Sequence, residues 1–166
     1  KTDSKRERER IGNGYDGRAV REGLPRGLCG VRIESEAGVV AHSDGDVAIH
    51  ALCDALLGAA ALGDIGLHFP DSDDRWKGID SKLLLKEVMR MVRAKGYELG
   101  NADITIALQA PKLRPHIDSM RSKLAEVFAT DPGHISVKAT TPERLRFVGR
   151  KEGCEVWATV IICKAA

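Results

Sequence analysis

Three ionisable residues stand at four-residue intervals in an otherwise apolar stretch: Asp46, His50 and Asp54 in the segment 46–62. On a helix this spacing puts all three side chains on one face. Burying such groups costs several kcal/mol unless they are paired or bind a metal ion. The stripe therefore predicts either a metal site or a satisfied polar network at the core or its edge.

A second candidate site is the start of a helix predicted at Thr141 and Pro142. Thr suits the N-cap and Pro the first helical position. The free N–H groups and the positive dipole end of such a helix bind phosphate. The alternative is a capped helix with a solvated basic face. The basic residues nearby in sequence are Lys138, Arg144, Arg146 and Arg150.

A third candidate is the acidic, glycine-containing segment GDIGLHFPDSD at 63–73. Carboxylates among glycines can hold sugar hydroxyls or a cation. The alternative is an ordinary surface loop.

The elements that must position these residues follow from periodicity and capping. Residues 46–62 are rich in Ala and Leu, which favours a helix, and Ser43 to Asp46 fit an S-x-x-D capping pattern before it. Residues 81–95 and 115–130 have the apolar spacing of amphipathic helices.

Strands alternate with these helices, which indicates the α/β or α+β class. Residues 10–16 resemble a strand end leading into a turn, and 31–40 could form a hairpin. The segments 17–29 and 63–78 are predicted to be loops. The remaining predicted strands are 104–108, 135–140 and 155–163.

Composition bounds the class of protein. The 166 residues are 43% hydrophobic and 30% charged, as in a globular domain, and no apolar run reaches the roughly 18 residues of a membrane span. The net charge of +2 gives no reason to expect a nucleic acid or a membrane as partner. Four scattered cysteines without a CxxC pattern favour a reducing compartment. Residues 1–8 are predicted to be an arm or linker remnant, and residues 9–166 a single domain.

Five segments together resemble one family closely. The chain is similar to the 2-C-methyl-D-erythritol 2,4-cyclodiphosphate synthases of the non-mevalonate isoprenoid pathway from about Arg10 to its C-terminus, except at 17–29. The start RIGNGYD resembles bifunctional members in which this domain follows a cytidylyltransferase. The segments that carry the resemblance are AHSDGDVAIHALCDALLGAAALGDIG, FPDSDDRWKG, QAPKLRPH, KATTPE and GR-x-EG.

The resemblance implies an α/β subunit (an α+β sandwich) whose mixed sheet is packed on one side by helices. It implies a homotrimer with the sheets around the threefold axis and active sites between subunits. The substrate would be 4-diphosphocytidyl-2-C-methyl-D-erythritol 2-phosphate, cyclised with release of CMP. The location would be the bacterial cytoplasm, or the plastid stroma for a processed plant-type precursor.

The resemblance also implies roles for individual residues that hold metals and phosphates. Asp16 and His50 match zinc ligands, and Glu143 matches the ligand of a second cation, Mg²⁺ or Mn²⁺. His42 and Thr141 match catalytic positions that stabilise the transition state. The residues at the phosphates would include His42, Ser43, Thr140 and Thr141, with Asp54 as a further carboxylate of the site.

Other matches concern the organic parts of the substrate. Asp64 and Gly66 match ribose contacts, while Phe69, Asp71 and Asp73 belong to a loop that closes over the methylerythritol. Phe147 and Arg150 match residues near the threefold axis, where some members bind a prenyl diphosphate. The residues matching the cytosine pocket are Leu108, Ala110, Pro111, Lys112, Leu113 and Arg114.

Arg18 departs from the family, which has a third zinc-binding histidine at this position. Arginine stays protonated and cannot bind zinc. Either zinc is held more weakly by Asp16, His50 and phosphate, or Arg18 pairs with Asp16 or grips the diphosphate. His68 is the one histidine that could substitute as a ligand.

Two functional alternatives remain open. The first is a degenerate member that binds cytidine nucleotide and forms a trimer but turns over poorly; the second is a trimerising scaffold for an upstream cytidylyltransferase. The divergence at 17–29 fits either a changed loop or a local shift of reading frame.

Overall fold

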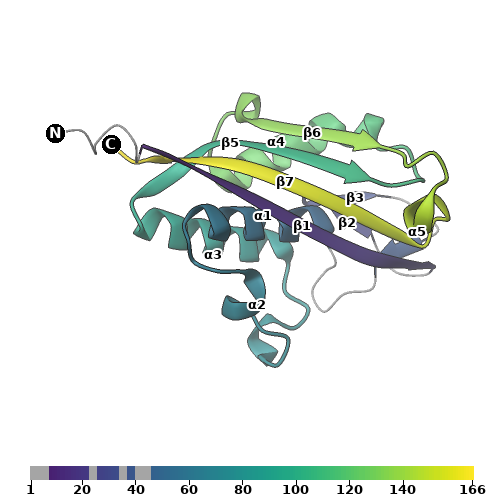
Figure 1. Ribbon diagram of the computed structural model, residues 1–166, viewed down its shortest axis with the longest axis horizontal. Helices are drawn as coiled ribbons and strands as arrows, with labels where there is room; N and C mark the ends of the chain where they lie inside the picture. The colour runs from purple at the N-terminus through teal and green to yellow at the C-terminus, as the bar shows by residue number, and fades with distance from the viewer. Residues whose placement is uncertain (1–7, 23–25, 34–36, 40–45) are drawn as a thin grey trace.

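The computed structural model describes residues 8–22, 26–33, 37–39 and 46–166. Its main sheet has five strands in the order β4-β1-β7-β5-β6 (Figure 1). β5 and β6 are parallel, and the other neighbours are antiparallel, so the sheet is mixed. Its strands are β1 (Glu9–Glu22), β4 (Ala37–Val39), β5 (Tyr97–Ala107), β6 (Ile135–Thr140) and β7 (Gly153–Lys164); β2 (Arg26–Leu28) and β3 (Val31–Ile33) form a separate pair.

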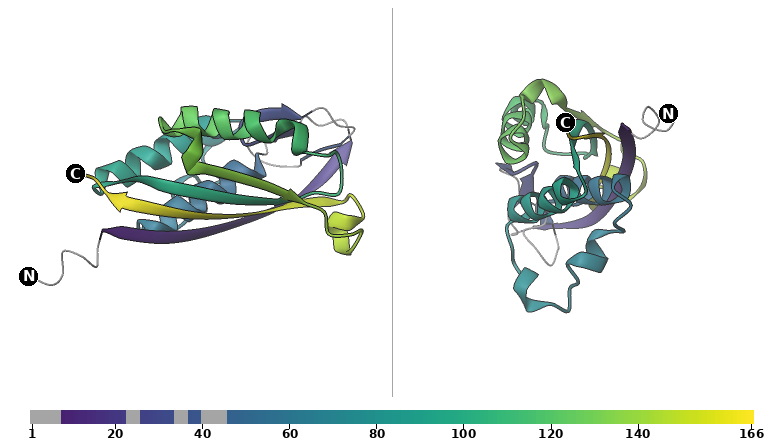
Figure 2. Two further views of the ribbon diagram at one scale, coloured as in Figure 1. Left: turned by 90° about the horizontal axis from the view of Figure 1, so that it is seen from above. Right: turned by 90° about the vertical axis from the view of Figure 1, so that its left-hand side faces the viewer.

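Three long helices cover one face of this sheet and leave the other face open (Figure 2). The predicted fold, a mixed sheet with helices on one side, is confirmed. Within the described residues, no helix is both long and apolar enough to cross a bilayer. The helices are α1 (Val47–Ala59), α3 (Ser81–Ala94) and α4 (Ile117–Phe128), with single turns at α2 (Ile65–His68) and α5 (Arg146–Gly149) and 3-10 turns at Asp74–Trp76, Arg114–His116 and Pro132–His134.

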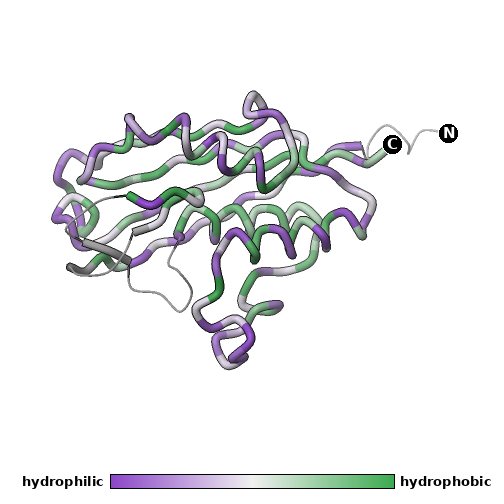
Figure 3. Tube along the Cα trace, turned by 180° about the vertical axis from the view of Figure 1, so that it is seen from behind, coloured by the Kyte–Doolittle hydropathy of each residue, from purple (hydrophilic) through white to green (hydrophobic). Residues whose placement is uncertain are grey.

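Helix α1 is the centre of the core. Of its thirteen residues, only Asp54 and Gly58 are not buried. Apolar residues also follow the strands against which the helix packs (Figure 3). Gly12 and Gly14 of β1 are buried and permit the close approach of the helix: an added Cβ would lie 1.8 Å from the Ala55 carbonyl oxygen and 1.9 Å from that of Ala51, respectively.

Replacing Gly14 with alanine is therefore expected to lower the free energy of unfolding by about 3 kcal/mol or more, because the helix backbone must move off the sheet. Gly58→Ala, in helix α1 against which Gly14 packs, is the matched control. No atom lies within 4 Å of its added Cβ, so the better helix propensity of alanine should raise stability by about 1 kcal/mol. Urea denaturation of both variants measures the two effects, and equal midpoints would contradict this packing.

The prediction of a turn after residue 16 and a loop at 17–29 is wrong. β1 continues to Glu22 because its later residues pair with β7 and β4: Arg18 lies opposite Cys154, and Val20 opposite Val39. Long-range pairing overrides a segment that has no strand periodicity of its own. The predicted hairpin at 31–40 is also wrong, since β3 pairs with β2 and β4 pairs with β1.

The helix predicted to begin at Pro142 does not form there. Glu143 and Arg144 have φ angles of 53° and 63°, in the left-handed region that a right-handed helix excludes. They make a turn, and the single turn of α5 follows only at Arg146. The chain therefore offers no helix N-terminus at Thr141 for phosphate.

Candidate active site

Asp16, Arg18 and His50 come together where β1 crosses the start of α1. The Nε of Arg18 donates a hydrogen bond to Oδ2 of Asp16 at 3.1 Å. Nδ1 of His50 lies 3.4 Å from the same oxygen. The His50 side chain is 6% exposed and that of Asp16 15%, so the carboxylate is largely enclosed between its two partners. The pairing of Arg18 with Asp16, one of the two outcomes expected from the sequence, is present.

Asp46 and His50, two of the three residues of the predicted polar stripe, have different partners. Asp46 is the N-cap itself, one residue before the helix, and its carboxylate accepts hydrogen bonds from the backbone N–H groups of Cys29, Gly30 and Ile49. It belongs to a satisfied buried network. His50 faces Asp16, and its Nε2 lies 3.2 Å from Oγ of Ser81 on α3. Only the middle of the stripe belongs to the Asp16 cluster.

The residues at this cluster do not fit a zinc ion held by protein donors. Structural and catalytic zinc sites use at least three such donors, and no group of three His, Cys, Asp or Glu side chains in the described parts of the chain could hold a metal. Arg18 adds repulsion: unit charges 4 Å apart interact by roughly 4 kcal/mol near a protein surface, and a divalent ion doubles this. His68 does not complete the set, because its Nε2 lies 2.7 Å from the carbonyl oxygen of Leu62.

The cluster opens into a pocket of about 360 Å³ between α1, α2 and the segment that follows α2. Phe69 and Trp76 form one wall, with an edge-to-face contact at 4.8 Å between ring centroids. Such an aromatic wall can exclude water from a bound ligand, and Arg18 adds a positive charge to the same pocket. The lining residues are Arg18, His50, Ile65, Gly66, Phe69, Pro70, Asp71, Trp76 and Leu84.

Some of the predicted ribose and loop residues line the pocket, and others cap short helical turns. Gly66, Phe69 and Asp71 line the pocket. Asp64 instead caps α2, its Oδ1 accepting from the N–H of Leu67 at 2.9 Å. Asp73 caps the following 3-10 turn and is bound by the Arg75 guanidinium, which lowers its pKa. An N-cap carboxylate keeps a second oxygen, so Asp64, next to the pocket residue Ile65 in sequence, retains an acceptor.

Asp54 holds the first turn of α2 at the edge of the pocket, because its Oδ1 accepts a hydrogen bond from the N–H of Ile65 at 2.9 Å. Partial burial raises the pKa of this carboxyl above its ordinary 3.8, although the Ile65 bond opposes the rise. A raised pKa means that folding disfavours the charged form. This cost is absent below pH 3.8, where both states are protonated, and complete above the raised pKa.

Asp54→Asn keeps an acceptor oxygen and removes the charge. Its stability relative to the unmodified protein is expected to rise as the pH increases through the raised pKa, and then to stay level to pH 7. Urea unfolding of both proteins from pH 3.5 to 7 measures the difference. A stability difference independent of pH would show that folding does not disfavour the charged form of Asp54.

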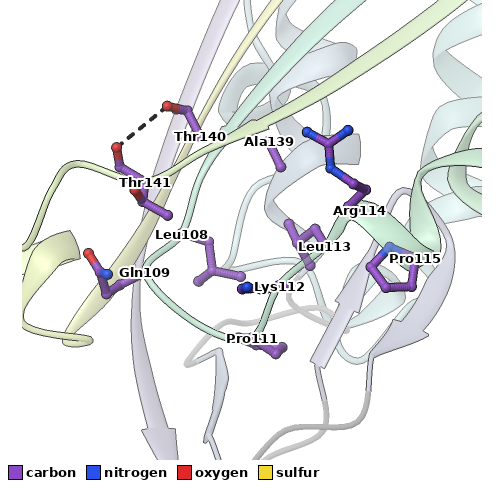
Figure 4. Close-up of a pocket in the computed structure, with 10 residues that line it drawn as sticks. All are labelled: Leu108, Gln109, Pro111, Lys112, Leu113, Arg114, Pro115, Ala139, Thr140 and Thr141. Atoms are coloured by element: carbon purple, nitrogen blue, oxygen red, sulfur yellow. Dashed lines mark hydrogen bonds between the residues drawn. The ribbon is translucent and has the colours of Figure 1, made fainter.

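A second pocket, of about 490 Å³, lies between the ends of β5 and β6 and the segment before α4 (Figure 4). It contains most of the residues predicted to bind cytosine. Ala110 is the exception, since it lines a separate hollow beside Arg150. Figure 4 shows the lining residues on two facing segments: Leu108, Gln109, Pro111, Lys112, Leu113, Arg114 and Pro115 on one, and Ala139, Thr140 and Thr141 on the other.

Gln109 also lines this pocket, and it begins the segment QAPKLRPH that carries the resemblance. Its Oε1 accepts the N–H of Arg144 at 3.1 Å, which fastens the turn after β6 to the pocket.

The described contacts join neither Glu143 nor the predicted axis residues Phe147 and Arg150 to the side chains of Asp16 and His50. Glu143 is exposed in the turn after Thr141. Phe147 packs against Gly153, and Arg150 is paired with Glu152 at 3.0 Å. His42 and Ser43, together with the proposed S-x-x-D cap, lie outside the described residues.

Comparison with known proteins supports the resemblance. A family model, the YgbB family, matches residues 9–163. The 2-C-methyl-D-erythritol 2,4-cyclodiphosphate synthase of Vibrio campbellii is 58% identical over 155 residues, which cover 93% of this chain and 98% of that protein. The enzyme of the same name from Porphyromonas gingivalis is 56% identical, covering 94% of this chain and 96% of that protein.

Solved structures of related proteins have a similar fold. The bifunctional IspDF from Campylobacter jejuni matches with a TM-score of 0.90 at 46% identity, covering 94% of this chain and 42% of that chain. A 2C-methyl-D-erythritol-2,4-cyclodiphosphate synthase in its CDP-bound form matches at a TM-score of 0.86 and 42% identity, covering 92% and 99%. The expected assignment as an enzyme, a lyase of isoprenoid biosynthesis, is confirmed by these relatives. This chain belongs to the YgbB family, that of the cyclodiphosphate synthases.

Proposed function

We propose that this chain converts 4-diphosphocytidyl-2-C-methyl-D-erythritol 2-phosphate into 2-C-methyl-D-erythritol 2,4-cyclodiphosphate and CMP. The observation that carries the proposal is the pocket formed by residues between Leu108 and Pro115, which has most of the predicted cytosine-binding residues on its walls. The CDP-bound relative supports a cytidine nucleotide as the ligand. The relatives' names support the cyclisation.

The reaction exchanges one phosphoanhydride bond for another. An oxygen of the 2-phosphate attacks the β-phosphorus, and the bond from that phosphorus to the oxygen of the CMP phosphate breaks. CMP leaves with the bridging oxygen and the electron pair, so no co-reactant is required. The protein must hold two phosphates in line and neutralise charge that gathers on their oxygens. Thr140 and Thr141 lie at the nucleotide pocket, while Arg18 and His50 provide polar groups at the other.

Among the residues that the structure describes, none lines both pockets of one subunit. We infer that a complete site combines the nucleotide pocket of one copy with the Asp16 pocket of its neighbour. The open face of the sheet supports association: Ile11 is 70% exposed, Tyr15 49% and Trp157 39%. Tyr15 and Trp157 lie opposite each other in the sheet with ring centroids 5.7 Å apart. Apolar side chains gathered on a sheet face are typical of an interface, here that of the expected homotrimer.

Glu143 is proposed as the ligand of a second cation, Mg²⁺ or Mn²⁺. Its exposed carboxylate follows Thr141 at the nucleotide pocket, and Mg²⁺ is usually held by one or two carboxylates together with substrate phosphates. A fusion to a cytidylyltransferase is supported by the bifunctional relative, of which this chain covers 42%. The bacterial relatives support the bacterial cytoplasm as the location.

The test measures the release of CMP from the proposed substrate by chromatography. The reaction is run without a chelator, with a chelator, and again with added Mg²⁺. Steady turnover supports the synthase. CMP bound tightly without turnover would instead favour the degenerate member, for which the observation is Arg18 on the carboxylate of Asp16. Absence of both binding and turnover would contradict a cytidine-nucleotide function altogether.

A further inference from the structure

Arg18 places a permanent positive charge at the pocket beside α2. About a third of its side chain is exposed, and it lines the pocket together with His50 and Asp71. Its Nε is bound to Asp16, which fixes the plane of the guanidinium. Arginine has five N–H donors, so a guanidinium held through Nε keeps the donors of both terminal nitrogens for another acceptor.

Asp16 is already engaged by two partners of its own subunit. Arg18 contacts it at 3.1 Å and His50 at 3.4 Å. A metal ion on this carboxylate would have to displace Arg18, and from the described residues it would then gain only Asp16 and His50 as protein ligands. The same geometry suits an anion, because a planar guanidinium binds phosphate through two parallel N–H bonds.

We propose that Arg18, oriented by Asp16, takes the place of a metal ion in this pocket: it excludes zinc and binds the oxygens of the nucleotide's terminal phosphate. The inference rests on the proposed function, since it takes the diphosphate of a cytidine nucleotide as the ligand. A fixed guanidinium needs no reorganisation when charge gathers on those oxygens, which is the property that makes a preorganised cation effective.

The experiment uses two probes, CDP and zinc ion, with the assembled protein. Calorimetry gives the affinities for CDP and CMP with and without a chelator, and equilibrium dialysis gives the affinity for zinc. The variants are Arg18→Ala, Arg18→Lys and Arg18→His. The control is Arg90→Ala on α3, which removes an arginine that is likewise paired to a carboxylate, Glu87, but stands away from the pocket.

With Mg²⁺ present throughout, so that the cation proposed at Glu143 is retained, a zinc-selective chelator is expected to leave the CDP affinity of the unmodified protein unchanged. Arg18→Ala should weaken CDP roughly 10- to 100-fold, the loss typical of charge-assisted hydrogen bonds. CMP, which lacks the terminal phosphate, should bind as before. Arg18→Lys should fall between, because lysine keeps the charge but not the planar pair of donors. Arg90→Ala should leave every affinity unchanged.

Arg18→His tests the exclusion of metal. It adds a third donor beside Asp16 and His50 and should bind zinc at least tenfold more tightly than the unmodified protein. Equal zinc affinity in the two proteins would overturn the proposal, as would CDP binding by the unmodified protein that is lost when the zinc-selective chelator is added in the presence of Mg²⁺. CDP affinity unchanged in Arg18→Ala would also overturn it. Failure of the unmodified protein to bind CMP and CDP at all would instead refute the proposed function.

Discussion

Asp46→Ala should leave little folded protein at 25 °C. The buried carboxylate accepts hydrogen bonds from three backbone N–H groups, at 3.0 Å from Cys29, 2.7 Å from Gly30 and 3.1 Å from Ile49. Alanine leaves all three N–H groups without an acceptor, and each unsatisfied donor lowers the free energy of unfolding by roughly 1–3 kcal/mol. A domain of this size is stable by only about 5–15 kcal/mol. The loss should appear as a much lower urea concentration at the unfolding midpoint, or as the circular-dichroism spectrum of an unfolded chain in the absence of urea.

Asp80→Ala is the matched control for a helix cap. Asp80 caps α3 with a single bond to the N–H of Lys82, and about half of its side chain is exposed. Its loss should cost only about 1 kcal/mol. Asp46→Asn, which keeps one acceptor oxygen, should fall between the two alanine variants. Similar losses for Asp46→Ala and Asp80→Ala would show that Asp46 acts as an ordinary cap and does not tie the β2–β3 turn to the helix.

The contrast between these caps shows what the sequence could predict. The composition of α1 predicted a buried helix, and its spacing placed Asp46, His50 and Asp54 on one face. Spacing alone could not say what each residue contacts, because their partners lie far away in the chain. Asp46 binds the turn at Cys29, His50 binds Asp16, and Asp54 binds the first turn of α2.

The errors have the same origin. Residues 17–22 lack strand periodicity, yet they form β1 because β7 and β4 offer partners on both sides. Thr141 and Pro142 satisfy the local rules for a helix start, but the left-handed backbone at Glu143 and Arg144 turns the chain away. Pairing with distant strands decides the first case, and the backbone conformation at Glu143 and Arg144 decides the second. The lining of the pocket between β5 and β6 was predicted more fully from the resemblance, because one continuous segment supplies most of it.

Two inactive variants, mixed, should regain about a quarter of the original turnover per site. Asp16→Ala removes the carboxylate that orients Arg18 and His50, and it should lower kcat at least roughly 100-fold. Ala139→Trp fills the nucleotide pocket from an exposed position on β6. If a site takes one pocket from each of two neighbouring copies, random mixing in a closed ring pairs two intact pockets at about one site in four.

The variants are unfolded together in urea, refolded, and assayed for CMP release, with each variant alone as the baseline. The matched control mixes Asp16→Ala with His50→Ala. Both changes lie in one pocket, so no arrangement of those subunits restores it. Recovery in the first mixture alone requires two copies at each site. If the first mixture stays as inactive as its components while both variants assemble, the two pockets act within one subunit and the open sheet face has another purpose.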